Sequence, residues 1–342
     1  MMETMGNEVQ CQSMFRLTPN QIHCLHGLLT TRYHLQGSYE VCTMEALGMF
    51  LFTMAGAQPN RSTNNRMVRS GSTVSIYFHR VLNAMNAMAA DILKPVDPNF
   101  EGVHPRIMED ASFHPFHGSI GAVDGTHVHV VVPRQASMVH RGRPRKTTKN
   151  VLVVVGWDDR IIFADAGTPG STHDQRALSS DIRRYRFTFP RPPFGKYFLV
   201  DSGYSCRYGF LPPYMDVRYH TDEWEAAQPV GREEHYNFLH SSLRNAIERV
   251  FGIVKGQWRI LKGIPYFPDP TTQPSIILAA FALHNFRMDI SRDPHFITQN
   301  PLYNGYPIQP VHPPLADAYD APNSEIAMSQ LREAIADMVF NS

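Results

Sequence analysis

The apolar positions of residues 1–95 repeat with the spacing of helices. Four of them share one helical face at i, i+3, i+4 and i+7: Leu47, Phe50, Leu51 and Met54. Gly56 and Pro59 then break the pattern, and a second helix is predicted after Ser72, whose hydroxyl can serve as its N-cap. Short helices joined by tight turns are compatible with a helix-turn-helix, although many other helical modules share this pattern.

A different pattern begins near residue 113. Apolar runs at 118–133, 150–157 and 160–167 predict three strands, the first with a break at Gly125, and a fourth strand is predicted at 196–204. A helix is predicted over 172–184, where Thr172 and Gln175 have the spacing of a capping box. Further helices are predicted over 241–261 and 274–290, and the second is apolar on nearly all sides, which indicates burial. This order predicts an α/β layered domain with a mixed sheet.

These patterns divide the chain into four parts. Residues 1–95 form a predicted helical domain, 96–112 a linker, 113–290 the α/β domain, and 291–342 a proline-rich arm with a C-terminal amphipathic helix. The composition, 43% hydrophobic and 18% charged, indicates a folded protein with a substantial core. The net charge of +1 permits a polyanionic partner without requiring one.

Three classes of protein are disfavoured by the sequence. No run approaches the ~18 apolar residues of a membrane span, and the N-terminal residues lack the pattern of a signal peptide. The four cysteines are widely spaced, which argues against a disulfide scaffold or a cysteine-rich zinc module. A reducing compartment is therefore expected.

Four acidic residues mark a candidate metal site. Asp124 lies inside the first apolar strand and Asp201 at the end of the fourth, while Asp174 opens the helix after the third strand. Glu248 lies beside the apolar face of the long helix. Carboxylates at buried positions need a compensating cation. Convergence of these oxygens would suit Mg²⁺ or Mn²⁺, and two such ions could act at a phosphodiester.

Each acidic residue also has a purely structural interpretation. Asp124 with Gly125 can mark a bend, and Asp174 can complement a helix dipole. Glu248 can pair with Arg244, four residues earlier on the helix. The segment 201–203 is a turn by composition. We favour the metal site because all four interpretations would otherwise have to apply together.

Five motifs in order resemble those of the Harbinger-type (PIF/Harbinger) DDE transposases and their domesticated nuclease-like relatives. They are VDGTH at 123–127, GSTHD at 170–174, VDSGY at 200–204, NAIERVFG at 245–252 and ALHN at 282–285. Any one of them is weak alone, but the ordered set is specific. The resemblance spans about 43–290 and every acidic position of the family is intact.

The resemblance implies a ribonuclease-H-like catalytic domain with a mixed five-stranded sheet, preceded by a helix-turn-helix-like domain. It implies a catalytic triad of Asp124, Asp201 and Glu248, with Asp174 as a fourth ligand and two divalent ions, Mg²⁺ or Mn²⁺, as cofactors. The expected function is hydrolysis and transfer of DNA strands by a metal-dependent nuclease or transposase, in mobile or domesticated form. The alternative is a non-catalytic chromatin-associated protein that keeps the fold.

A basic stretch between the first two strands is the candidate DNA-binding segment. It contains no acidic residue, and its candidate phosphate contacts are Arg141, Arg143, Arg145, Lys146 and Lys149. A minor-groove AT-hook and a solvated loop are the alternatives. The same stretch is typical of a weak nuclear-localisation signal.

The partners expected are DNA and, by resemblance, a separate Myb/SANT-like DNA-binding protein. The proline-rich arm and the acidic C-terminal helix, with Glu325, Glu333 and Asp337, are the candidate docking element. A homodimer is a further option, and no membrane partner is expected. The predicted localisation is the nucleus, with the cytoplasm as the compartment before import with the partner.

Overall fold

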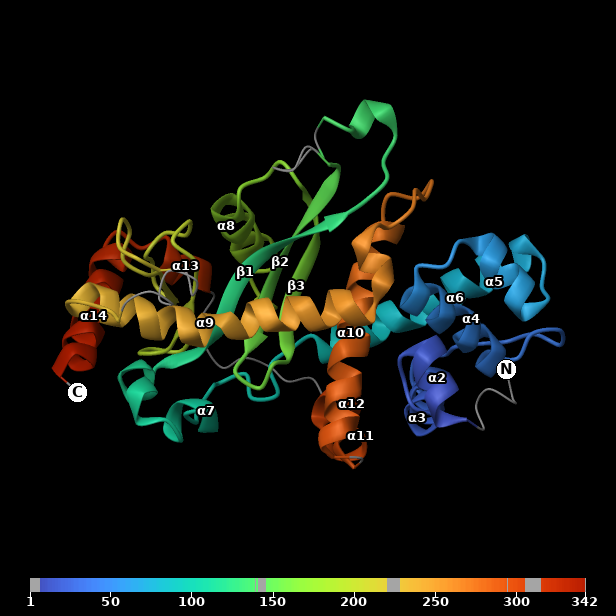
Figure 1. Ribbon diagram of the computed structural model, residues 1–342, viewed down its shortest axis with the longest axis horizontal. Helices are drawn as coiled ribbons and strands as arrows, with labels where there is room; N and C mark the ends of the chain where they lie inside the picture. The colour runs from blue at the N-terminus through green and yellow to red at the C-terminus, as the bar shows by residue number, and fades with distance from the viewer. Residues whose placement is uncertain are drawn as a thin grey trace.

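A mixed five-stranded sheet lies at the centre of the computed structural model, which describes residues 7–138, 140, 146–219, 228–293, 295–304 and 315–341 (Figure 1). Its strand order is β3-β2-β1-β4-β5. The antiparallel strands are β1 (Ser119–His129), β2 (Thr148–Gly156) and β3 (Ile161–Pro169), and the parallel additions are β4 (Tyr197–Leu199) and β5 (Phe210–Leu211). The predicted α/β fold of the ribonuclease-H-like class is confirmed.

The individual strands differ from the prediction in three ways. β1 runs through Gly125 without a break, since Gly125 pairs with Leu152 in the regular antiparallel register. β4 covers three residues of the predicted nine, because the chain turns away after Leu199. β5 has two residues, and a segment this short carries no periodicity from which it could be predicted.

Helices cover both faces of the sheet, as Figure 1 shows. Alternate residues of β1 point to opposite faces, so Val123 packs with α8 (Asp174–Arg184), and Ala122 packs with α9 (Arg232–Gln257) and α10 (Thr272–Arg292). The predicted capping box on α8 is wrong. His173 precedes its first residue, and no side chain caps it. No helix of the described residues is long and apolar enough to cross a membrane.

The N-terminal zone is helical, as predicted. Its helices are α2 (Glu8–Phe15), α3 (Pro19–Thr31), α4 (Thr43–Gly56), α5 (Asn60–Met67) and α6 (Gly71–Ile92). Ser70 rather than Ser72 caps α6, since its hydroxyl accepts a hydrogen bond from the Thr73 amide. α6 packs against α10, so one hydrophobic core continues from the N-terminal helices to the sheet. The predicted linker contains α7 (Pro105–Met108) and the first two residues of a 3₁₀ helix, η1 (Ala111–Phe116).

The C-terminal segment contains four helices within its described ranges: α11 (Phe296–Gln299), α12 (Pro301–Asn304), α13 (Leu315–Tyr319) and α14 (Ser324–Asn341). Residues 305–314 of the predicted proline-rich arm lie outside the described residues. α14 packs against α9. Arg232 of α9 forms ion pairs with Glu333 and Asp337, so two of the three acids assigned to partner docking are engaged within the chain.

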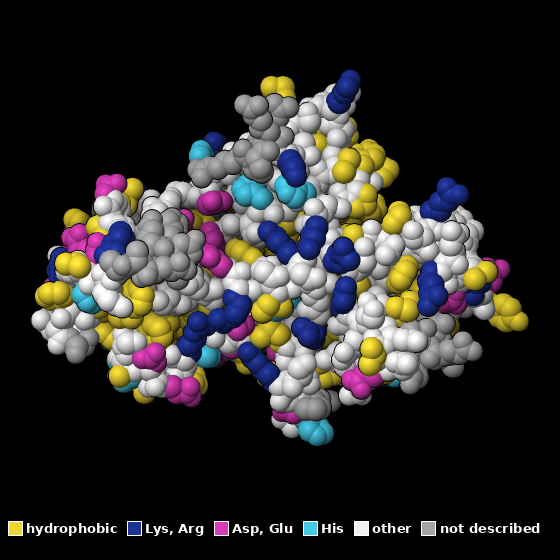
Figure 2. Space-filling view, in the orientation of Figure 1, with side chains coloured by type: hydrophobic (Ala, Val, Ile, Leu, Met, Phe, Trp, Pro, Cys, Tyr) yellow, Lys and Arg dark blue, Asp and Glu magenta, His cyan; other side chains and the backbone are white. Residues whose placement is uncertain are grey.

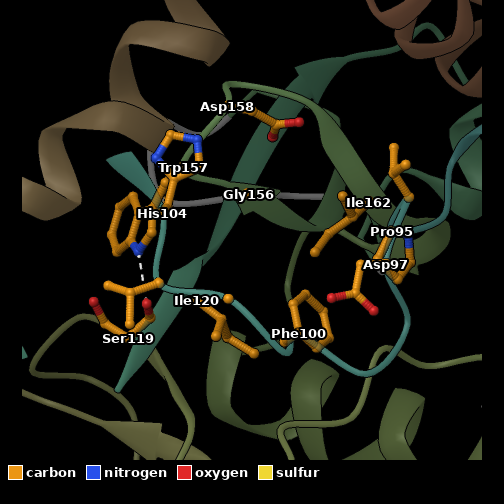
Figure 3. A pocket seen from close by; sticks show the side chains of 13 residues that line it. Pro95, Asp97, Phe100, His104, Ser119, Ile120, Gly156, Trp157, Asp158 and Ile162 are labelled. Atoms are coloured by element: carbon orange, nitrogen blue, oxygen red, sulfur yellow. Dashed lines mark hydrogen bonds between the residues drawn. The ribbon is translucent and has the colours of Figure 1, made fainter. Parts of the chain in front are cut away.

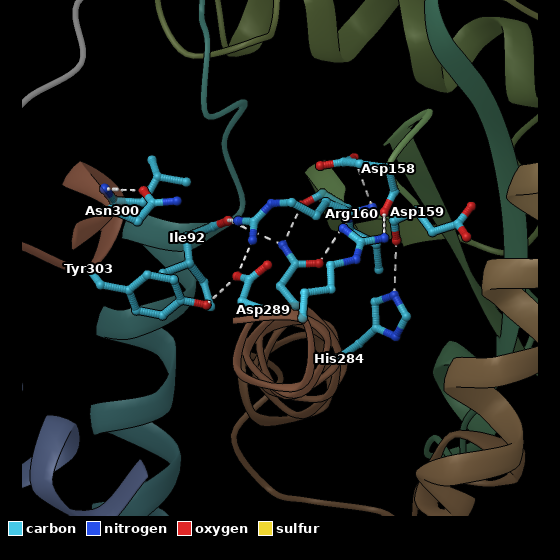
Figure 4. Close-up of polar contacts among 12 residues, drawn as sticks. Ile92, Asp158, Asp159, Arg160, His284, Asp289, Asn300 and Tyr303 are labelled. Atoms are coloured by element: carbon cyan, nitrogen blue, oxygen red, sulfur yellow. Dashed lines mark hydrogen bonds and ion pairs between the residues drawn. The ribbon is translucent and has the colours of Figure 1, made fainter. Parts of the chain in front are cut away.

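A buried polar cluster joins the N-terminal helices, the sheet and α10 (Figure 4). The Arg160 guanidinium pairs with Asp289 and donates to the carbonyl of Ile92, the last residue of α6. Asn285 accepts from the Ile161 amide at 2.9 Å and donates to the Ile161 and Ile92 carbonyls. His284 contacts the Asp159 carbonyl. The ALHN motif is therefore a structural clamp rather than part of the candidate catalytic site.

Removing one partner of the buried Arg160–Asp289 pair should destabilise the protein. Both side chains are 1% exposed, so Asp289→Asn leaves the guanidinium without its counter-charge. We expect the free energy of unfolding to fall by about 3 kcal/mol. The double variant Arg160→Met/Asp289→Leu should be closer to the wild type, since it buries no charge. Urea unfolding measures both, and equal losses in the two variants would contradict this account.

A second buried acid, Asp181, lies on α8 and forms no ion pair with any residue that the structure describes. It is 2% exposed, and its Oδ2 atom has no hydrogen-bond partner among the described residues. Burial, with a contribution from Asp165, raises the pKa of Asp181 to about 7, against a smaller opposing effect of Arg184. The folded state therefore binds a proton that the unfolded state has already released near neutral pH.

Stability should accordingly fall as pH rises from about 4 to about 7, the interval between the unfolded and folded pKa values of Asp181. Above that interval the charged carboxylate is destabilising, and Asp181→Asn should raise the melting temperature at pH 8. The effect should disappear near pH 4, where both states are protonated. Thermal unfolding of the two proteins across this range tests the prediction, and an equal difference at both pH values would contradict it.

Candidate active site

One guanidinium gathers the three predicted catalytic acids. Arg244 of α9 approaches Asp124 of β1 at 3.1 Å and Asp201, just after β4, at 3.4 Å, both through the same nitrogen, Nη2. Its other terminal nitrogen, Nη1, is 2.7 Å from Glu248, one turn later on α9. Carboxylates from two neighbouring strands and a helix thus converge at one point. The helical pair of Arg244 and Glu248, considered above as a structural alternative, is present as well.

The site is buried at its base and open at its rim. The side chain of Arg244 is 7% exposed and that of Asp124 16%, whereas Asp201 and Glu248 are 34% and 57% exposed. Burial raises the pKa of Asp124 to about 6, against the opposing effect of Arg244. Burial disfavours the charged guanidinium, but the surrounding acids outweigh it and raise the pKa of Arg244. A ligand can therefore approach from the Glu248 side.

Asp174 lies on the opposite side of β1 from this cluster. Its Oδ1 accepts a hydrogen bond of 2.6 Å from the Asn150 amide of β2. A Cβ atom at Gly125 would come within 2.3 Å of the same oxygen, so the glycine lets Asp174 approach the strand beside Asp124. Asp174 is thus near the three acids but does not contact Arg244. Its predicted place as a fourth ligand remains a prediction.

Sequence reasoning did not find Tyr204 as a residue of the site. The side chain is 5% exposed, and its hydroxyl has no hydrogen-bond partner among the described residues. Burial, together with Asp124 and Asp174, raises the pKa of this phenol well above its usual range, so the hydroxyl stays protonated. A neutral donor beside a cluster of acids can bind an anionic oxygen. In the sequence, Tyr204 is marked only by its position as the last residue of the VDSGY motif.

The donor set suits a divalent cation. Four carboxylates lie in or beside the site, and Arg244 supplies a single positive charge against them. Within the described ranges, no group of three or more His, Cys, Asp or Glu side chains is already arranged around a common metal position. The three acids that contact Arg244 point toward the guanidinium instead. Hard oxygen donors in excess of cations are the chemistry that Mg²⁺ and Mn²⁺ prefer.

The predicted DNA-binding segment is described only in part. Arg141, Arg143 and Arg145 lie outside the described residues. Lys146 is exposed next to β2. Lys149 lies within β2 and is 7% exposed, which is a correction: burial lowers the pKa of its ammonium and leaves little of it for a phosphate. The alternation that makes a strand places this lysine on the same face as Val151 and Val153, the face that packs with α9 and α10.

An apolar cavity of about 260 Å³ lies at the far end of β1 (Figure 3). Phe100, Trp157 and Ile162 line it, and the Trp157 indole donates to the Ser119 carbonyl at 3.0 Å. Ser119 is five residues before Asp124, or about 17 Å along the strand. The cavity is therefore separate from the acidic cluster.

Comparison with known families defines the class of this domain. Residues 123–285 match the model of the DDE superfamily endonucleases, and residues 2–87 match a domain of unknown function. The chain thus carries a DDE superfamily endonuclease domain, whose matched range contains all three acids that contact Arg244. The predicted resemblance to Harbinger transposase-derived proteins is confirmed.

Individual relatives cover about half of the chain. "Protein ALP1-like" of Arabidopsis thaliana is 25% identical over 50% of this chain and 43% of its own length. "Putative nuclease HARBI1" of Rattus norvegicus is 27% identical, and that of Homo sapiens 26%, each over 52% of this chain and 48% of its own length. The chain therefore spans about half the length of these relatives. No solved structure matches it significantly.

Removing Arg244 should destabilise the metal-free protein. Arg244→Gln leaves Asp124 and Asp201 facing each other without a cation, and we expect a loss of about 3 kcal/mol at pH 7.5 in the presence of a chelator. Ca²⁺ should then raise the melting temperature more in this variant than in the wild type, because the ion replaces the missing charge.

Arg249→Gln is the matched control for this prediction. Arg249 is on the same helix and pairs with Asp159 at 2.6 Å, but its side chain is 46% exposed, and such surface pairs contribute ~0–1 kcal/mol. Thermal unfolding with and without Ca²⁺ compares the two variants. An equal response of both to Ca²⁺ would show that Arg244 is not the counter-ion of the acidic cluster.

Proposed function

We propose that this protein is a divalent-metal-dependent DNA nuclease of the Harbinger type, which hydrolyses DNA phosphodiester bonds and transfers the resulting strands. The observation that carries the proposal is the convergence of Asp124, Asp201 and Glu248 on Arg244 within a DDE superfamily endonuclease domain. Acids of this kind, contributed by two strands and a helix, suit a reaction that requires hard oxygen ligands at one position.

Each side chain has a proposed role in this reaction. Asp124, Asp201 and Glu248 would hold the metal ions, and Asp174 would complete their coordination. When bound, such ions supply charge neutralisation and an activated water. Arg244 keeps the acids converged before binding, and the protonated Tyr204 hydroxyl, which has no partner among the described residues, would donate to an anionic oxygen of the substrate. The burial of Asp124 and Arg244 excludes water from the base of the site and strengthens each of these interactions.

The context of the reaction is also a proposal. A Myb/SANT-like partner would select the DNA sequence, and the protein would act in the nucleus. Arg141, Arg143 and Arg145 would contact phosphates near the scissile bond, and Lys146 would extend that contact. Because Glu333 and Asp337 already pair with Arg232, a partner that docks on α14 would use its remaining exposed side chains, which include Glu325 and Ile326.

Conversion of either of two acids to its amide should abolish cleavage without unfolding the protein. Asp124→Asn and Glu248→Gln keep the side-chain shape but remove an anionic ligand, so we expect duplex cleavage in Mg²⁺ or Mn²⁺ to fall by about two orders of magnitude or more. The same ions should raise the melting temperature of the wild type and raise that of the variants less.

Asp181→Asn provides the matched control, since it makes the same chemical change at a buried acid of α8 outside the acidic cluster. It should cleave DNA at the wild-type rate. Cleavage that persists in both active-site variants would reject the site assignment. A folded wild type that binds metal but cleaves no duplex would instead favour the non-catalytic chromatin-associated alternative.

A further inference from the structure

A polar cavity of about 550 Å³ lies where the N-terminal helices meet α9 and α10. α2, the start of α3, and the two long helices form its walls, and Arg16 and Arg287 are its charged residues. None of the residues that line it is Asp or Glu. The cavity therefore presents two positive charges without an acid to balance them.

Both guanidiniums keep capacity for another ligand. Neither forms an ion pair within the described ranges. Arg16 Nε is buried and has no hydrogen-bond partner among the described residues. Arg287 donates one hydrogen bond, of 3.2 Å, to the Gln257 side chain. A buried donor without an acceptor is costly, and an anionic oxygen would satisfy it.

Hydrogen bonds of two glutamine side chains hold the walls of the cavity in place. The Gln257 side chain accepts from Arg287 and donates to the Arg16 carbonyl at 3.3 Å, so one amide links α9 to both arginines. On the opposite wall, the Gln21 side chain donates to the Ser291 hydroxyl at 3.1 Å. The Arg287 guanidinium and the backbone of Arg16 are thus held in place before any ligand arrives, which lowers the entropic cost of binding.

The cavity shares α9 with the acidic cluster. Ile253 and Gln257 line it, five and nine residues after Glu248, or about 8 and 14 Å along the helix. Residues 249–268 contain four basic and no acidic residues, namely Arg249, Lys255, Arg259 and Lys262. Figure 2 shows Lys and Arg side chains gathered over this half of α9 and its crossing with α10. A Cβ atom at Gly252 or Gly256 would meet no other atom within 4 Å, so this part of the helix is open.

We propose that this cavity binds a backbone phosphate of duplex DNA. That phosphate would lie a few nucleotides from the one that is cleaved at the acidic cluster, so the contact would orient the substrate across α9. The inference rests on the proposed nuclease function and adds the surface that holds the DNA. The ligand is a phosphodiester rather than a base, because the cavity offers guanidiniums and amides and no stacking side chain. A phosphate contact of this kind binds every DNA sequence alike.

Two substitutions remove the charges with little structural cost. Arg16 ends α2 in the left-handed conformation, with φ of 62°, where glycine is favoured, so Arg16→Gly should keep or raise the melting temperature. Arg287→Met keeps an unbranched apolar side chain on α10. Lys196→Met is the matched control, because Lys196 precedes β4 at the end opposite Asp201 and lies outside the cavity.

Binding is measured on the full chain with a labelled 30-base-pair duplex and a chelator present, so that cleavage does not interfere. We expect Arg16→Gly and Arg287→Met each to weaken binding about threefold to tenfold, equally for A·T-rich and G·C-rich duplexes. Each should also reduce the slope of log affinity against log salt by about 1. Lys196→Met should leave both the affinity and the slope unchanged.

Three results would overturn the proposal. Unchanged affinity and salt slope in both variants would mean that DNA does not enter the cavity. A thermal stabilisation by inorganic phosphate at constant ionic strength, lost in Arg16→Gly while duplex affinity is unchanged, would assign the cavity to a small anion. A loss restricted to one sequence class would indicate base contacts. If the wild type cleaves DNA and both variants bind it as tightly as the wild type, the proposed phosphate site is wrong and the nuclease function stands. If DNA binding depends on both arginines but the wild type cleaves no DNA, the nuclease function is wrong and the phosphate site stands.

Discussion

Mutual repulsion of carboxylates is the constraint on which the candidate site depends, and Arg244 resolves it. Asp124, Asp201 and Glu248 come from separate elements and would separate without a shared cation. A guanidinium suits this position because its planar fork offers several donors from one charge. To place the guanidinium there, α9 must pack at a fixed distance from the sheet. It lies against β1 and β2, and its apolar face, including Ile247 and Val250, belongs to the core on that side.

Because the site depends on where α9 lies, many buried polar residues hold the helices and strands in place and take no part in the candidate active site. Arg160, Asn285 and Asp289 clamp the β2–β3 hairpin to α10 and to the end of α6. That clamp fixes α10, against which the N-terminal helices pack. The helical zone and the sheet therefore share one core, and the cavity at Arg16 and Arg287 takes its walls from helices on both sides of that junction.

Sequence patterns predicted the parts of this fold that have a clear period. The strands at 150–157 and 160–167 were found because they are apolar runs bounded by glycine or aspartate, and α10 because it is apolar all round. β5 was missed because two residues carry no period. α9 was predicted to begin nine residues too late, since it begins with the largely polar segment 232–240. The convergence of the acids was anticipated from their placement and from the family resemblance. The contacts of Arg244 were not, because helical spacing predicts only one acidic partner for it, and the structure shows three.

The charges along α9 are unevenly distributed, although the net charge of the whole chain is only +1. At its start, Glu333 and Asp337 of α14 neutralise Arg232. Past Glu248 the helix and the turn after it carry only basic charges, and the cavity beside them adds two more. An acidic C-terminal helix packed on one end of α9 thus leaves the other end cationic. A nearly neutral chain can in this way attract a polyanion to one surface, because binding responds to local potential rather than to net charge.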